Sequence, residues 1–168
     1  MTEPNSHPLR FQRSAEIDRL VARFCDCTLP CAEWTHEAHL TVGLWFIARH
    51  PPDEALDRVR ASIQRYNAAC NTPNSQTRGY HETLTRFYLG MIAIHLTGAT
   101  VENINDLESL HDVRVANSLL ERYADRGLPL KYYSRERLFS AAAKADWVEP
   151  NLRPLENLAG LPDFCRLR

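Results

Sequence analysis

The segment 87–96 constrains the fold more than any other, because its ten residues are apolar on nearly every side of a helix. A helix that crosses a bilayer needs about 20 apolar residues, so this segment is too short to span one. A shorter helix that is apolar all round must instead be covered by other helices. The segment therefore predicts a helical protein packed around it.

Most of the remaining chain has apolar residues at the i, i+3, i+4, i+7 spacing of helices, without the alternation typical of strands. The expected helices cover about residues 14–28, 35–50, 52–70, 81–97, 105–126 and 134–144. No period of 20–50 residues repeats, which argues against a solenoid. We expect an all-α, single-domain bundle of about five to six helices over residues 13–168, with a leader at 1–12 and an extended tail.

Short polar residues, proline and glycine predict where these helices begin and end. Ser14, Thr35 and Ser134 are expected N-caps, because their hydroxyls can accept from free amides of the first turn. Pro52 suits the first position of the third helix, where no amide donor is needed. Gly98 is expected to end the fourth helix. The tail is expected to be pinned by Trp147, Leu152 and Leu155.

The net charge of the chain and the composition of its first ten residues limit its binding partners and its cellular location. The net charge of −1 lacks the basic surplus that phosphate binding needs, which argues against nucleic acid as the main partner. The first ten residues are polar and have no apolar core like that of a secretory signal. We expect no membrane segment and a cytoplasmic protein, with a homodimer possible.

The five cysteines are an odd number, and without a secretory signal they predict reduced thiols. The spacing of Cys25, Cys27 and Cys31 does not match the usual paired ligands of structural zinc. Cys27 also continues the apolar stripe of the first helix, so a packing role is favoured.

The first candidate site element is Trp34 with His36 and His39 at the start of the second helix. Residues three apart share a helix face, and Gly43 continues that face without a side chain. The space above Gly43 suits either a ligand or a crossing helix. The positive end of the helix dipole disfavours a protonated imidazole at His36, so a neutral histidine that can bind metal is expected.

The second element, Tyr80-His81-Glu82-Thr83-Leu84-Thr85, opens the apolar fourth helix. A polar stripe runs on from it through Thr85, Tyr88 and His95. Polar groups on a central helix are costly unless they are satisfied, so the stripe indicates either a structural network or a pocket.

One helix lies between the second and the fourth, so their N-termini should meet at one end of the bundle. His36, His39 and His81 are then the expected metal ligands, because three imidazoles and a water suit zinc or non-haem iron. Glu82 is expected as a fourth ligand or as the general base, with His81 also placed in the catalytic set. The divalent metal and a small polar substrate define the leading functional prediction, a metal-dependent hydrolase or oxygenase.

Aromatic and amide side chains near this end are the candidate substrate contacts. They are Trp34, Tyr66, Asn67, Asn71, Tyr80 and Thr85. Arg135 and Arg137 could instead bind a carboxylate or phosphate, although a capped surface helix is the favoured interpretation.

Two other functions remain open. One is a non-catalytic binding protein, in which the same polar groups form a structural network. The other is a ferritin-like di-metal protein, built from two Glu-x-x-His pairs and two single glutamates on other helices. Its residues would be Glu33, His36, Glu108 and His111, with Glu16 and Glu82. A His111-Asp112 phosphohydrolase dyad is favoured less, since it lacks the expected surrounding histidines.

The chain resembles a family of small, uncharacterised bacterial proteins. The shared elements are Trp-x-His-x-x-His-Leu at 34–40, Tyr-Asn at 66–67, Gly-Tyr-His-Glu-Thr-x-Thr at 79–85 and Tyr-Ser-x-x-Arg-Leu at 133–138. The resemblance implies that these elements belong to one site. It implies no reaction, and the two Glu-x-x-His pairs are not part of the shared pattern.

Overall fold

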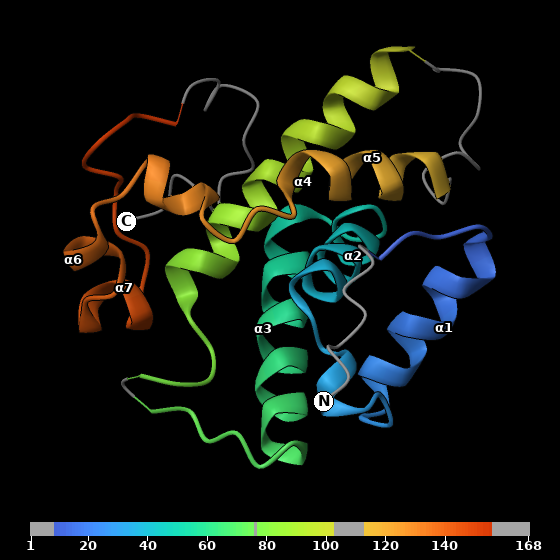
Figure 1. Ribbon diagram of the computed structural model, residues 1–168, viewed down its shortest axis with the longest axis horizontal. Helices are drawn as coiled ribbons and strands as arrows, with labels where there is room; N and C mark the ends of the chain where they lie inside the picture. The colour runs from blue at the N-terminus through green and yellow to red at the C-terminus, as the bar shows by residue number, and fades with distance from the viewer. Residues whose placement is uncertain (1–8, 76, 103–112, 156–168) are drawn as a thin grey trace, which may run out of the picture.

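The computed structural model describes residues 9–75, 77–102 and 113–155 and is all-α over them, without a strand (Figure 1). Its α-helices are α1 (Ser14–Cys25), α2 (His36–Ile47), α3 (Pro52–Ala69), α4 (Glu82–Glu102), α5 (Val113–Tyr123), α6 (Arg135–Leu138) and α7 (Ala141–Ala145). Two short 3₁₀ helices, η1 (Cys31–Glu33) and η3 (Leu128–Lys131), lie in the connections. The predicted fold class is confirmed.

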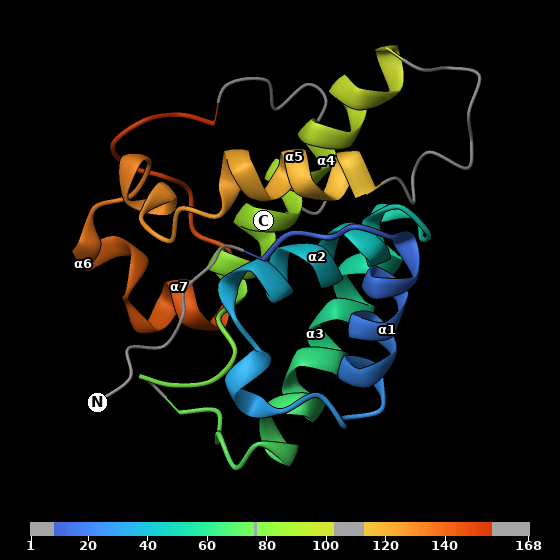
Figure 2. The same cartoon turned by 45° about the vertical axis from the view of Figure 1, so that its right-hand side comes forward.

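Two helices form the centre of the molecule. α2 packs against α1, α3, α4 and α5, and α4 packs against α2, α3, α5 and α7. α1 and the α6–α7 pair lie at opposite sides of this centre in both views (Figures 1 and 2). A Cβ atom on Gly43 would lie 2.8 Å from Cδ1 of Ile92 and 3.2 Å from Cδ2 of Leu89. The space above Gly43 is therefore filled largely by the crossing helix α4.

Several predicted helix boundaries are confirmed by their capping contacts. The Thr35 hydroxyl accepts from the Ala38 amide at 3.3 Å, and the Ser134 hydroxyl accepts from the Arg137 amide at 3.3 Å. Pro52 occupies the first residue of α3. Ser14 is instead the first residue of α1, one position after the cap at Arg13.

Other boundaries differ from the prediction for local reasons. Gly98 lies inside α4, because its cost of up to about 1 kcal/mol in a helix does not outweigh continued helical hydrogen bonding. Ser140 caps α7 by accepting from the Ala143 amide, so the predicted sixth helix is two short ones. Cys27 follows the end of α1 with a φ of 62°, so it does not continue the stripe. The predicted capping box at Asn105 and Glu108 lies outside the described residues.

The segments before α1 and after α7 lie against the helices. Phe11 is 5% exposed, and its backbone amide and carbonyl bond the Asn117 side chain at 2.9 Å each. Residues 9–12, assigned to the leader by the sequence, are thus attached to α5. In the tail Leu155 is buried and Trp147 is partly buried, as expected, but Leu152 is 60% exposed and does not pin the chain.

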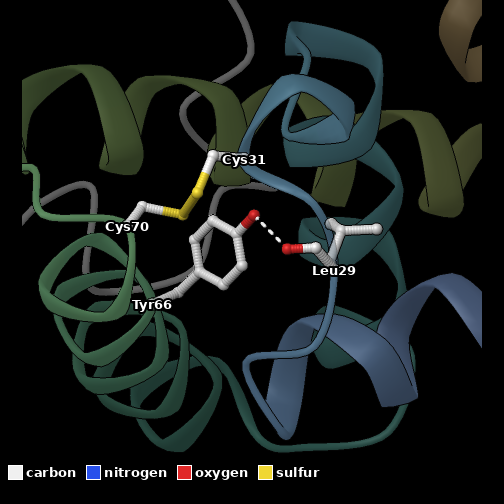
Figure 3. Close-up of a disulfide and its surroundings, with 4 residues drawn as sticks. All are labelled: Leu29, Cys31, Tyr66 and Cys70. Carbon is white, nitrogen blue, oxygen red and sulfur yellow. Dashed lines mark hydrogen bonds between the residues drawn. A yellow bond between two sulfur atoms is a disulfide. The ribbon is translucent and has the colours of Figure 1, made fainter.

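A disulfide joins Cys31, at the start of η1, to Cys70, just after α3 (Figure 3). The prediction that the thiols are all reduced is therefore wrong for this pair, whereas Cys25 and Cys27 are free. The Cα atoms of Cys31 and Cys70 are 5.9 Å apart, within the range that a disulfide can bridge. Beside the disulfide, the hydroxyl of Tyr66 donates to the Leu29 carbonyl at 2.8 Å (Figure 3).

Among the helices that the structure describes, none combines the length and the apolar character needed to cross a membrane.

Candidate functional site

A cavity of about 480 Å³ lies between the start of α2, the end of α3 and the first half of α4. Seven of the predicted site residues line it: Trp34, His36, His39, Asn67, Tyr80, His81 and Thr85. The rest of the wall is mainly apolar, with Leu40, Gly43, Val59, Ile63, Leu84, Leu89 and Ile92, and it also includes Thr72, Gly79, Tyr88 and Arg126. The two histidine elements of the sequence therefore converge on one cavity.

The tautomer of His39 follows from its hydrogen bond. Its Nδ1 lies 2.6 Å from the Thr35 carbonyl oxygen, which can only accept, so Nδ1 carries the proton. The ring stacks on Trp34 with their centroids 3.7 Å apart. Desolvation lowers the pKa of His39 to about 4, despite the bond to Thr35. His39 is therefore a neutral imidazole whose Nε2 bears a lone pair.

His36 and Trp34 each have a buried nitrogen without a partner in the described part of the chain, Nε2 in His36 and Nε1 in Trp34. Desolvation lowers the pKa of His36, and the Tyr123 backbone opposes this shift. Because Nε2 has no partner, Nδ1 is the nitrogen that can face that backbone group. Both residues line the cavity, and each brings one buried nitrogen to it that is not used in a hydrogen bond, an acceptor in His36 and a donor in Trp34.

His81 has a structural role in this arrangement. Its Nδ1 accepts from the Leu84 amide at 3.3 Å, which caps the start of α4. Its Nε2 lies 3.0 Å from the Leu138 carbonyl oxygen and therefore carries the proton. Burial lowers the pKa of His81, which keeps the ring neutral. Both nitrogens are engaged with backbone, so neither has a lone pair available for a metal.

Glu82 points away from the cavity into a buried polar cluster. Its carboxylate accepts from Nε and Nη2 of Arg60 at 3.0 and 2.7 Å and from the Tyr80 hydroxyl at 2.7 Å. Nη1 of Arg86 lies 4.0 Å away. The hydrogen bonds of the carboxylate raise the pKa of Arg60, and burial with this negative charge raises that of Tyr80. Glu82 is thus held as an ion-pair partner, not presented to a ligand.

Two predicted substrate residues do not line the cavity. Tyr66 is 1% exposed, and its hydroxyl is bonded to Leu29. Its ring packs against the ring of Trp34 in a tilted arrangement, with the centroids 5.2 Å apart. Asn71 is exposed and adopts a positive φ of 52° in the turn after α3, a conformation that asparagine tolerates better than most residues.

The structure adds Arg126 and Tyr88 to the site. The Tyr88 hydroxyl donates to the Asp125 carbonyl at 3.1 Å, and its ring meets His36 edge-on with the centroids 4.8 Å apart. Tyr88 was visible in the sequence as part of the polar stripe. Arg126, in the loop between α5 and η3, carried no local signal that distinguished it from the other arginines.

Of the described residues in the alternative sets, Glu16 and Glu33 do not line this cavity. Glu16 accepts from the amides of Gln12 and Arg13 at the start of α1, and Glu33 pairs with Arg23 at 3.1 Å. Glu108, His111 and Asp112 lie outside the described residues. Arg137 donates to the Glu149 carbonyl at 2.6 Å and Arg135 lies over Phe139, so both belong to the local packing of α6.

No three histidine, cysteine or acidic side chains come together in a metal-binding arrangement within residues 9–75, 77–102 and 113–155. The reason at this site is the orientation of His81 and Glu82, which are both bonded elsewhere. Among the described histidines of the cavity wall, His36 and His39 are the two that have an imidazole lone pair not used by backbone.

The lowered pKa of His39 predicts a pH-dependent stability. The folded protein holds the proton less well than the unfolded chain, whose histidine pKa is about 6.5, so this contribution is complete above pH 6.5 and is lost toward pH 4. Between pH 7.5 and 4.5 the native protein should lose about 2–3 kcal/mol more stability than His39→Asn, which keeps a donor for Thr35. Urea unfolding at both pH values measures this, and parallel losses in the two proteins would contradict it.

No protein-family model, curated protein or solved structure matches the chain. The resemblance to an uncharacterised bacterial family therefore stays a prediction, and the site is interpreted from its own geometry.

Proposed function

We propose that the cavity binds a small polar organic molecule, and that His36 accepts a hydrogen bond or a proton from it. The observation that carries this proposal is the pair of buried, partnerless nitrogens at His36 and Trp34 in the cavity wall. Buried polar atoms in folded proteins are almost always satisfied, so these two call for a ligand or ordered water. A cavity of about 480 Å³ lies within the usual size of small-molecule sites.

The neutral states of His36 and His39 favour a role in which they accept a proton or a hydrogen bond from the bound molecule. A histidine whose pKa is lowered stays neutral at physiological pH, so it can accept a proton from a substrate in the manner of a general base. His36 has the better position for that role, because its buried Nε2 has no competing partner. His39, with a pKa of about 4, is better suited to accept a hydrogen bond that orients the molecule.

The rival function, a structural polar network, makes the opposite prediction about stability. His36→Asn keeps a donor near the position of Nδ1 and removes the partnerless Nε2 together with the ring edge that meets Tyr88. We expect it to change the free energy of unfolding by less than about 1 kcal/mol. His81→Ala, which removes two bonds to backbone, should cost about 2–4 kcal/mol.

Urea unfolding of both variants tests the assignment. An equal, large loss in His36→Asn would favour the structural network over the binding site. His36→Gln serves as the matched control, because its longer amide restores a polar group near the position of Nε2.

A metal-bound form of the same cavity is the second candidate. It is favoured by His36 and His39, which offer two imidazole lone pairs from one face of α2. Such a pair suits zinc or iron, which would activate a bound water, but catalytic zinc usually has three protein ligands. Metal analysis of protein purified without chelator or histidine tag tests this: about one equivalent, lost in His36→Asn, supports a metal enzyme.

A further inference from the structure

We propose that the molecule bound in this cavity is a small monoanion, a carboxylate with an apolar body, whose charge is held by Arg126. This inference rests on the proposed function and adds the chemical class of the ligand. It starts from the charges of the cavity wall, where none of the described lining residues is an aspartate, glutamate or lysine. Among these described residues, Arg126 alone has a formal charge when the three histidines are neutral.

Arg126 lines the cavity together with the polar residues at the start of α2, Trp34, His36 and His39, which we call its polar end. It lies in the loop just after α5, beside Asp125, whose backbone carbonyl is bonded to Tyr88. It lines the same cavity as His36 and His39, and after desolvation its positive charge also contributes to the lowered pKa values of both histidines. Within residues 9–75, 77–102 and 113–155 Arg126 forms no ion pair, so its charge is available to a ligand.

The acidic groups near Arg126 are engaged with other partners. The Asp125 carboxylate accepts from the Gly127 amide at 2.8 Å and lies 3.5 Å from Nζ of Lys131. Burial would raise the pKa of the Glu37 carboxyl, but its own backbone, the Thr35 side chain and the charge of Arg126 together lower it. Neither carboxylate lines the cavity, so neither occupies the place of an anionic ligand.

Two further features favour a negative charge at this end. α2 begins at His36, so the positive end of its dipole faces the same part of the cavity. The Trp34 indole N–H is a buried donor without an acceptor, and a carboxylate oxygen is a strong one. Neutral imidazoles at His36 and His39 complement this with acceptors for a hydroxyl or amine on the ligand.

The remaining wall selects an apolar body. Leu40, Ile63, Leu84, Leu89 and Ile92 line it from three helices. Burying apolar surface of a ligand against such side chains is favourable. A ligand that is charged at one end and apolar along the rest therefore fits better than a sugar or a phosphate-rich nucleotide.

Matched pairs of a carboxylate and its primary amide test the charge class directly. The probes are 3-phenylpropanoate with 3-phenylpropanamide and hexanoate with hexanamide, each titrated to about 10 mM into the ¹⁵N-labelled full chain at pH 7.5. The readout is the indole N–H resonance of Trp34, assigned with Trp34→Phe. We expect at least one carboxylate to bind about tenfold more tightly than its amide.

Arg126→Gln should reduce that preference to about threefold or less, and Arg126→Lys should restore part of it. Arg122→Gln, which removes an exposed charge stacked on Tyr123 on α5, should leave the preference unchanged. Urea unfolding of each variant verifies that the fold is retained.

The outcomes separate the two levels of the proposal. Amides that bind as tightly as carboxylates, or a preference that survives Arg126→Gln, would overturn the monoanion while leaving the small-molecule site intact. If no probe moves the Trp34 resonance, both the monoanion and the proposed binding function are overturned. Carboxylate binding that depends on Arg126 but not on Arg122 supports both.

Discussion

Replacing Glu82 by alanine should lower the free energy of unfolding by about 3–5 kcal/mol, measured by urea denaturation at pH 7. The carboxylate is 5% exposed and accepts three hydrogen bonds, two from Arg60 and one from Tyr80. Its removal orphans the buried Tyr80 hydroxyl and leaves the buried Arg86 with one fewer countercharge nearby. Uncompensated buried charge, and not the lost attraction alone, makes the effect large.

Glu54→Ala is the matched control for this result. Glu54 also pairs with an arginine, Arg58, at 2.7 Å, but both side chains are about half exposed. Solvent screens such a pair, so its loss should cost less than about 1 kcal/mol. Equal costs in the two variants would show that the cluster around Glu82 is hydrated and not buried. A catalytic role for Glu82 alone would instead predict lost function with unchanged or increased stability.

Removing the Cys31–Cys70 disulfide should lower the stability by about 4 kcal/mol, which is the chain-entropy expectation for a sequence separation of 39. The comparison is Cys31→Ser/Cys70→Ser against the native protein in urea, each with and without dithiothreitol. The native protein should lose stability on reduction, whereas the double variant should be insensitive to the reductant. Cys31 lies shortly before Trp34 in the chain, and Cys70 lies shortly after Asn67. Both Trp34 and Asn67 line the cavity, so loss of the disulfide should also loosen this wall.

Cys25→Ser/Cys27→Ser is the control, since both residues are free thiols. It should retain the full response to dithiothreitol. Peptide mapping after thiol blocking gives the direct readout, a linked pair of peptides containing Cys31 and Cys70. Recovery of both residues in blocked form from the native protein would contradict the disulfide.

Features that depend on neighbouring residues could be predicted from the sequence. Helical periodicity predicted the all-α fold, and the caps at Thr35 and Ser134 and the start at Pro52 followed from backbone groups within one helical turn. The wall of the cavity was partly predictable for the same reason. His36 and His39 share a helix face, and the polar stripe on α4 marked Thr85 and Tyr88.

The contacts of each of these residues depend instead on tertiary packing. The bond of His81 to Leu138, 57 residues away, and the ion pair of Glu82 with Arg60 depend on how distant helices pack, so the sequence left both as metal or catalytic candidates. Tertiary packing also brings Cys31 to Cys70 and places Arg126 in the cavity wall. A hydrogen bond, a disulfide or a shifted pKa needs two groups within a few ångströms of each other. The periodicity of one helix gives no information about the distance to a group on another helix.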